Sequence, residues 1–312
     1  MAKISGRKRG RIASRLAAAA VTAALVGTGA SAFAADNPTA KPFKAPTAKP
    51  AKGLKGAANT PASAPGDAPV FGLYGIDKSN TAWFYNPDGN GGLESRVSFP
   101  YNTNWNLKWV GQVDNDADNL ADGIWQADYN GNLSYAAADG SDPWKVGGGW
   151  NTYNTLLSPG NLGGAGAGDL LGRDASGTLY LYLGYGNGKM TSRYTVGGGW
   201  GQYTALAGNG DLTGDGKADI VARGADGTLW LYEGTGNYKA PFKPRTKIGG
   251  GWNIYNAIFA PGDIDLDGKA DLIARDNAGA LWLYKGTGNA AAPYQSRVKI
   301  GSGGWNTYRL FF

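Results

Sequence analysis

From residue 70 onward, the chain consists of short apolar runs separated by glycine-rich and acidic turns. One stretch predicts four consecutive strands, at 255–260, 272–275, 281–284 and 297–300. These segments are short and either alternate or are wholly apolar, as expected for strands of a buried sheet. An acidic loop follows the first of them, and a glycine-rich turn follows the last. The pattern predicts a four-stranded antiparallel unit.

This unit recurs along the chain. Its marker is a glycine-rich turn that runs into a tryptophan and, in most copies, an aromatic residue three positions later. The marker tryptophans are Trp105, Trp150, Trp200, Trp252 and Trp305. They are 45 to 53 residues apart, and a period of this length built from short strands is typical of a propeller blade. The sequence therefore predicts an all-β fold, a five-bladed β-propeller over residues 69–312.

The two ends of the repeat region predict how the ring closes. The first unit begins at 70–75, which aligns with a second strand, and its third strand is expected at 82–85. Residues 308–312 align with a first strand that has no blade left to enter. We expect this C-terminal strand to complete the first blade, which removes two exposed sheet edges. The missing and surplus strands match, so a closed monomer is favoured over an open array that closes by dimerisation.

The residues before the repeats differ in composition. Residues 1–34 combine basic residues, an apolar run at 16–25 and an Ala-x-Ala site at 32–34, which is typical of a signal peptide. The apolar run is too short to cross a membrane, so we expect a secreted, extracellular protein without a membrane span. Residues 35–68 are rich in Ala, Pro, Lys and Thr and predict a disordered linker. A plain spacer is favoured over a segment that rests on an anionic cell envelope.

Composition and charge exclude several function classes. The 312 residues contain no His and no Cys, which excludes Ser-His-Asp triads, thiol nucleophiles and zinc sites built from those side chains. The formal net charge of +6 is misleading, because residues 1–34 carry six basic residues and residues 35–68 a net +3. Residues 69–312 therefore carry a net −3. This mild acidity argues against nucleic-acid binding.

Three units carry the same nine-residue acidic loop. Oxygen ligands at positions 1, 3, 5 and 9, with a backbone carbonyl at position 7, suit a hard cation such as Ca²⁺. Position 6 is Gly or Asn, which tolerate the positive φ of a sharp turn. The predicted ligands are Asp114, Asp116, Asp118, Leu120 and Asp122 in the first loop, Asp211, Thr213, Asp215, Lys217 and Asp219 in the second, and Asp263, Asp265, Asp267, Lys269 and Asp271 in the third. We expect about three structural Ca²⁺ sites. Ordinary solvated turns are the alternative, but three such copies would crowd carboxylates at a cost without a cation.

Other interpretations of these loops fail. They are not EF-hands, because the twelfth position is not Glu. The Gly-Lys pairs at 216–217 and 268–269 lack the earlier Gly and the following Ser or Thr of a phosphate-binding loop, so we do not expect nucleotide binding. A fourth loop at 161–169 keeps Asp169 but has lost most of the other ligands, and it should not bind metal.

Two stretches resemble known families. Residues 218–232, together with the acidic loop before them, resemble the FG-GAP/VCBS repeat of integrin α-type propellers and secreted bacterial proteins. This resemblance implies that the three matching loops bind Ca²⁺. Residues 299–312 resemble the blade junction and C-terminal strand of tachylectin-type lectins, which are five-bladed and bind N-acetylated sugars between blades. The second resemblance implies glycan recognition.

Aromatic side chains are the candidates for ligand contact. The repeated tryptophans are either wedges in the core, which is favoured because large aromatics are mostly buried, or platforms for sugar rings. Tryptophans that break the repeat are better candidates for exposed contacts. The candidate ligand-binding residues are Trp150, Trp200, Trp252 and Trp305 within the repeat, and Trp109 and Trp144 outside it; Trp125 also breaks the repeat.

Three functions remain open at this stage. A lectin-like, non-catalytic module for extracellular or cell-wall glycans is favoured. A propeller that binds an extracellular protein, such as a protease, is the alternative. A glycosidase is less favoured, because such enzymes use a pair of carboxylates and no isolated pair of acidic residues stands out in the sequence.

Overall fold

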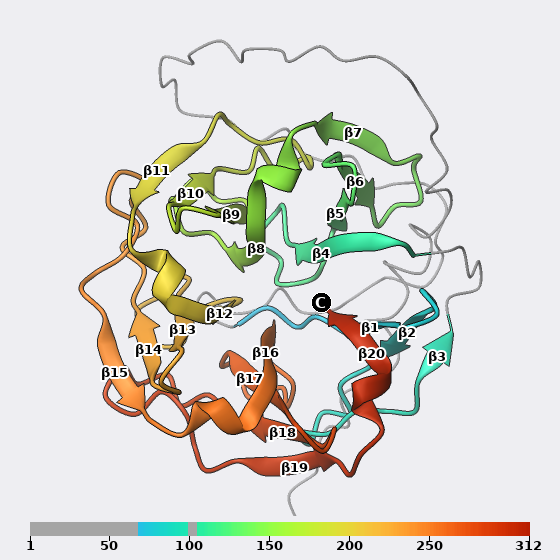
Figure 1. The fold of residues 1–312 in the computed structure, drawn as a ribbon, viewed down its shortest axis with the longest axis vertical. Helices are drawn as coiled ribbons and strands as arrows, with labels where there is room; N and C mark the ends of the chain where they lie inside the picture. Colours follow the sequence, from blue (N-terminus) through green and yellow to red (C-terminus); the bar gives the residue numbers. More distant parts are fainter. Residues whose placement is uncertain (1–67, 99–104) are drawn as a thin grey trace, which may run out of the picture.

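The computed structural model describes residues 68–98 and 105–312; the predicted signal peptide and the predicted linker up to residue 67 lie outside them. Five four-stranded antiparallel sheets stand as blades around a central axis (Figure 1). The five-bladed β-propeller predicted from the repeat is therefore confirmed. Among the described residues, no helix is long and apolar enough to cross a membrane.

The blades follow one another around the ring in chain order. Blade 1 contains β20 (Tyr308–Phe311), β1 (Leu73–Asp77), β2 (Ala82–Tyr85) and β3 (Val97–Ser98). Blade 2 contains β4 (Leu107–Val113), β5 (Gly123–Asp128), β6 (Leu133–Ala137) and β7 (Trp144–Gly147). Blade 3 contains β8 (Tyr153–Gly160), β9 (Asp169–Asp174), β10 (Leu179–Tyr182) and β11 (Tyr194–Gly197). Blade 4 contains β12 (Tyr203–Ala207), β13 (Ile220–Gly224), β14 (Leu229–Tyr232) and β15 (Thr246–Gly249). Blade 5 contains β16 (Tyr255–Gly262), β17 (Asp271–Asp276), β18 (Leu281–Tyr284) and β19 (Val298–Gly301).

The C-terminal strand closes the ring as predicted. β20 pairs antiparallel with β1, with Leu310 opposite Ile76. The backbone N–H of Tyr74 donates to the carbonyl of Phe312 at 2.8 Å, and the N–H of Phe312 donates back to Tyr74 at 3.1 Å. Strand β1 begins at Leu73 and not at residue 70 as predicted, because the residues before it cross the ring instead of pairing within the blade.

The hydrophobic core lies between consecutive blades. In blade 4, Leu229 and Leu231 of β14 are fully buried, whereas the alternate residues of this strand are partly exposed. One core cluster joins Leu179 and Leu181 of blade 3 to Trp200 and other residues of blade 4. The other four junctions have equivalent clusters. The period-2 pattern that makes a strand thus also supplies both faces of each blade with apolar contacts.

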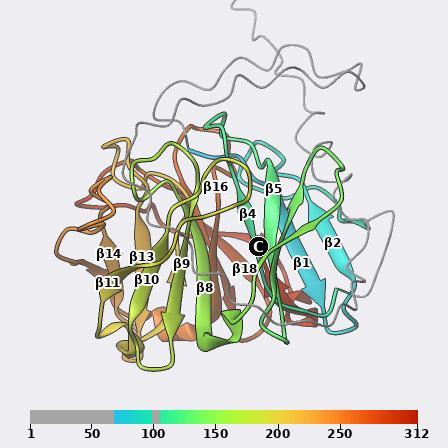
Figure 2. The same cartoon turned by 90° about the horizontal axis from the view of Figure 1, so that it is seen from above.

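The two ends of the propeller have different loops. In blades 1, 3, 4 and 5 the innermost strand follows a short 3₁₀ turn, at Trp305–Thr307 (η4), Trp150–Thr152 (η1), Trp200–Gln202 (η2) and Trp252–Ile254 (η3). The residue before each turn is a glycine in the left-handed region, such as Gly149 with φ 80°, where a side chain would be strained. We call this the tryptophan end. In blades 2 to 5 the innermost strand leads to an acidic loop or its degenerate copy, at the opposite end (Figure 2). We call this the loop end.

A cationic side chain from each blade binds the backbone of the next. Arg173 Nη1 donates to the carbonyl of Trp200 at 3.0 Å, and Arg223 Nη1 donates to Tyr255 at 2.6 Å. In blades 1 and 2 the cation lies on the innermost strand, and Lys108 Nζ donates to the carbonyl of Tyr153 at 2.7 Å. The five cations are Arg309, Lys108, Arg173, Arg223 and Arg275. Charged hydrogen bonds of this kind are stronger than neutral ones, so they hold the ring at every junction. The sequence analysis did not identify them.

Residues 68–72 cross the loop end as an extended strap (Figure 1, blue). On one side, the N–H of Ala68 donates to Gly268 of blade 5 at 3.0 Å. On the other side, the N–H of Val70 donates to Asn119 of blade 2 at 2.8 Å. The strap therefore links two blades that are not neighbours along the ring.

Candidate functional site

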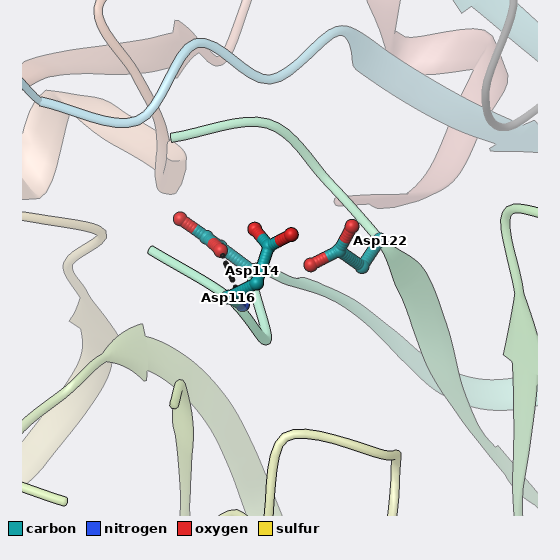
Figure 3. A group of neighbouring side chains, drawn as sticks. All are labelled: Asp114, Asp116 and Asp122. Atoms are coloured by element: carbon teal, nitrogen blue, oxygen red, sulfur yellow. Dashed lines mark hydrogen bonds between the residues drawn. The ribbon is translucent and has the colours of Figure 1, made fainter. Parts of the chain in front are cut away.

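The acidic loops bring carboxylates together at the loop end. In the first loop, Asp114, Asp116 and Asp122 each offer an oxygen, and these atoms lie within 4.8 Å of one another (Figure 3). The third loop does the same with Asp263, Asp265 and Asp271. Among the described residues these are the two groups of three carboxylates that could hold a metal ion.

The first Asp of each loop folds the loop around its own carboxylate. Asp263 Oδ2 accepts the N–H of Gly268 at 2.7 Å, and Asp114 Oδ2 accepts the N–H of Asn119 at 2.8 Å. This places position 6 in the left-handed region, as predicted, with φ values of 64° at Asn119, 80° at Gly216 and 90° at Gly268. The Asp at position 1 and the Gly or Asn at position 6 therefore form the loop itself. The Asp has this role in addition to offering an oxygen to a cation.

Position 4 of the loops is also left-handed, which the sequence analysis did not predict. It is Gly214 in the second loop and Gly164 in the degenerate loop, but Ala117 (φ 62°) in the first and Leu266 (φ 61°) in the third. A non-glycine residue in this region costs about 1–2 kcal/mol. Strain of this kind persists where the surroundings impose it and is common at functional sites.

The ninth Asp ties the loop to its own blade in blades 3, 4 and 5. Asp271 accepts the N–H of Ile264 in the loop at 2.9 Å and that of Gly286, just past the third strand, at 2.7 Å. Asp219 makes the equivalent pair of bonds in blade 4. Asp169 does so in blade 3, with Leu162 at 2.9 Å and Gly184 at 3.0 Å. This role explains why Asp169 is present in a loop that has lost the other acidic side chains.

Burial disfavours the charged form of several of these carboxylates and raises their pKa values. Desolvation raises the pKa of Asp271 to about 7 and that of Asp263 to about 6, and the neighbouring carboxylates add to both shifts. In the first loop it raises the pKa of Asp122 to about 7. Asp265 Oδ2 forms an ion pair with Lys285 Nζ at 2.8 Å. Asp265 Oδ1 is buried and has no hydrogen-bond partner among the described residues.

The predicted ligands at position 5, and those of the second loop, are not part of the two groups of three carboxylates. The fifth-position carboxylates accept the N–H of position 7 and are outside the two groups of three: Asp118 from Leu120 at 2.9 Å, Asp215 from Lys217 at 3.1 Å and Asp267 from Lys269 at 3.0 Å. In the second loop, Thr213 stands at position 3, so this loop offers fewer carboxylates. Its Asp215 forms ion pairs with Lys217 at 3.1 Å and Lys243 at 3.5 Å.

A pocket of about 420 Å³ opens beside the loops of blades 2, 3 and 4. The strap contributes Phe71 to its wall. The polar residues that line it are Gln112, Asp114, Asn119, Ser158, Asn161, Asn209, Asp211 and Lys217. Gln112 and Asn209 are both buried. The sequence analysis named neither, although each differs in type from the proline that stands two residues before the loop in blades 3 and 5.

The repeated tryptophans serve as core residues. Trp150, Trp200 and Trp252 are 6–7% exposed. The ring of Trp200 packs 4.5 Å from that of Tyr232, and the other two make the same contact with Tyr182 and Tyr284. This is the packing role favoured above, and it leaves little indole surface for a sugar ring. Trp305 lies in the same arrangement, with its ring 4.7 Å from that of Tyr85, but is only half-buried.

The tryptophans outside the repeat are also packed. Trp109 and Trp144 are half-buried, and the ring of Trp144 lies 4.8 Å from that of Tyr135. The expectation of an exposed contact is wrong for Trp125, which is fully buried and donates from Nε1 to the carbonyl of Gly188 at 2.9 Å. Its departure from the repeat reflects a local packing change, since the indole fills space between blades 2 and 3.

Comparison with known proteins supports the repeat identified in the sequence. Residues 211–274 match the family model of the FG-GAP-like repeat. This stretch runs from the second acidic loop through the third, so the resemblance is confirmed for this part of the chain. No curated protein sequence matches the chain significantly.

Solved structures similar to the chain include three propellers of low sequence identity. A lectin of Agrocybe aegerita, described as recognising non-reducing terminal N-acetylglucosamine, is 13% identical with a TM-score of 0.45, covering 79% of this chain and 85% of the lectin. The BP39L lectin of Burkholderia pseudomallei is 16% identical with a TM-score of 0.46, covering 76% and 72%. A mutant of AofleA from Arthrobotrys oligospora is 11% identical with a TM-score of 0.43, covering 77% and 75%.

Proposed function

We propose that this protein is an exported, calcium-stabilised β-propeller that acts as a non-catalytic binding module for glycans. The observation that carries the proposal is the state of the carboxylates at the loop end. Those that approach one another belong to the acidic loops, where backbone N–H groups hold the first and ninth Asp and Lys285 pairs with Asp265. They are thus committed to building the loops and holding a cation, and recognition is left to the uncharged groups beside them.

The third loop has the chemistry of a Ca²⁺ site. Asp263, Asp265 and Asp271 offer oxygens within 4.8 Å of one another, and oxygen is the ligand type that Ca²⁺ takes. Asp265 Oδ1 is buried without a partner among the described residues, and such an atom is costly to leave unpaired. A bound cation would satisfy it and favour the charged forms of its neighbours. The first loop has the same arrangement, and the second has Thr213 in place of one carboxylate.

A catalytic role is not favoured by the pocket carboxylates. Asp211 accepts the N–H groups of Thr213 at 2.8 Å, Gly214 at 2.7 Å and Gly216 at 2.6 Å. Asp114 is held in the same way within its own loop. A glycosidase needs one carboxylic acid and one carboxylate that both face the substrate. Side chains turned inward to cap their own loops do not supply that pair.

The glycan class and export rest on the sequence. Residues 299–312 resemble the blade junction of lectins that bind N-acetylated sugars, and residues 1–34 resemble a signal peptide. Export is tested by fractionating an expression host and sequencing the N-terminus of the protein recovered from the medium. We expect a mature chain that begins near Ala35; retention of residues 1–34 on a cytoplasmic protein would contradict export.

A glycan-array screen of the purified protein in Ca²⁺-containing buffer tests the binding function. We expect selective binding to one class of sugar. A blank array, followed by capture of one extracellular protein in a pull-down from culture medium, would replace the glycan proposal with a protein partner. Release of reducing sugar from a bound glycan would instead show an enzyme.

A further inference from the structure

We propose that the loop-end pocket is the glycan site and that it holds one uncharged terminal sugar unit per propeller, fixed by the side-chain amides of Gln112 and Asn209. This inference rests on the proposed function and locates its site. The evidence is the place of these two residues in the repeat, their burial, the space around them and the charge of the pocket.

Gln112 and Asn209 stand at the same distance in sequence from the acidic loops of two blades. Each stands two residues before the first Asp of its acidic loop, in blades 2 and 4. The same position is proline in the other two blades that carry such a loop, Pro159 in blade 3 and Pro261 in blade 5. Proline has no hydrogen-bonding side chain, so the fold does not require an amide at this position. The two amides flank blade 3, and both line the pocket.

The amide of Gln112 has an oxygen that a ligand would satisfy, and Asn209 lines the same pocket. Each residue is 5% exposed. Gln112 Nε2 donates to the carbonyl of Gly72 at 2.8 Å, which fixes the side chain against the strap. Gln112 Oε1 is buried and has no hydrogen-bond partner among the described residues. A buried acceptor without a partner costs about 1–3 kcal/mol, and a ligand hydroxyl or amide N–H that donates to it would remove this cost.

The degenerate loop of blade 3 provides the space. Gly160, Gly166 and Gly168 line the pocket, and a Cβ atom added to Gly166 would meet no atom within 4 Å. The loop that has lost its predicted metal ligands is therefore the wall that leaves room for a ligand. The strap forms another part of the wall with Pro69 and Phe71.

The lining selects an uncharged polar ligand. Its amide and hydroxyl groups, from Gln112, Ser158 and Asn209, match the donors and acceptors of a sugar. The carboxylates of Asp114 and Asp211 outnumber Lys217, the one cation among the described residues of the lining, and would repel an anion. The volume of about 420 Å³ lies near the lower end of the range for small-molecule sites, about 300–1,000 Å³. This suits a chain end of one or two sugar units rather than the middle of a long polymer.

Calorimetric titration with monosaccharides tests the proposal. The probes are N-acetylglucosamine, N-acetylgalactosamine, galactose and mannose, each added to the full mature protein in Ca²⁺-containing buffer. We expect one of them to bind with a stoichiometry of one per chain. Asn209→Ala and Gln112→Ala should each weaken this binding about tenfold or more, since each removes a buried hydrogen bond to the ligand. The matched control is Asn253→Ala, an exposed Asn of the tryptophan end, which should bind as the wild type does.

The outcomes separate this inference from the proposed function. A stoichiometry of four or five, or weakened binding in Asn253→Ala with normal binding in Asn209→Ala, would move the site to the blade junctions and leave a glycan-binding function intact. Failure of the wild type to bind any probe here and any glycan on the array would overturn both. The wild-type stoichiometry decides the question even if a variant does not fold, and thermal melting of each variant identifies that case.

Discussion

Arg275 Nη1 donates to the backbone carbonyl of Tyr308 at 2.8 Å. Arg275 lies on β17 of blade 5, and Tyr308 begins β20, the strand that completes blade 1. The same guanidinium nitrogen also donates to the carbonyl of Trp305 at 2.9 Å. A side chain of one blade thus holds the strand that closes the ring, in addition to the pairing of β20 with β1.

Replacing this cation should loosen the closure. We expect Arg275→Met to lower the free energy of unfolding by about 2–3 kcal/mol, because it keeps most of the apolar stem but removes charged hydrogen bonds to two partly buried carbonyls and to Asn256 Oδ1. Urea unfolding followed by tryptophan fluorescence measures the change. Lys189→Met, at an exposed lysine, is the control and should change the stability by less than about 0.5 kcal/mol. Equal effects of the two substitutions would contradict the clamp.

Calcium should stabilise the propeller through the acidic loops. A ligand that binds only the folded state raises its stability by mass action, so excess chelator should lower the melting temperature. Asp265→Asn should reduce the calcium content by about one ion per chain in metal analysis, because it alters the group that contains the unpartnered Oδ1. Asp142→Asn, an exposed acid, should leave the content unchanged. A melting temperature that chelation does not change, with no calcium found, would mean that the loops are ordinary turns.

Asp169 should make the calcium-free protein more stable in mild acid. Burial raises its pKa to about 6, even though three backbone N–H groups donate to it. An acid whose pKa is higher in the folded than in the unfolded state takes up its proton first in the folded protein, so its contribution to stability grows as the pH falls from about 7 to about 4. Asp169→Asn should reduce the gain in melting temperature between pH 7 and pH 5. The same gain in Asp169→Asn and wild type would show that another group is responsible; Asp142→Asn serves as the control.

Ala117 should be a site where glycine stabilises. Its φ of 62° costs a non-glycine residue about 1–2 kcal/mol, and glycine would remove this cost. Part of the stability gained would be lost again, because glycine has greater freedom in the unfolded chain. We expect Ala117→Gly to raise the free energy of unfolding by up to about 1 kcal/mol. The control is Ala165→Gly in the degenerate loop, where φ is not positive, and it should destabilise slightly. Chemical denaturation of both variants measures the difference, and a loss of stability in Ala117→Gly would contradict the strain.

The sequence by itself determined the architecture. The spacing of the marker tryptophans sets the blades, and the alternation within each unit sets its strands, because both are local and repeated. The match between residues 70–75 and residues 308–312 was enough to predict the closure. The nine-residue loops were also visible from their spacing, including the positive φ at position 6, because the geometry of one turn depends on the residues within it.

Only the tertiary structure decided how the blades hold one another and where a pocket forms. Arg309 and Lys108 act at the same kind of junction as Arg173 but lie on a different strand, so no shared sequence position reveals them. Gln112 and Asn209 are nearly a hundred residues apart and line one pocket because blades 2 and 4 flank a loop reduced to small residues. Such features depend on which distant residues the closed ring brings together. A repeat pattern does not record this, since it describes each blade by itself.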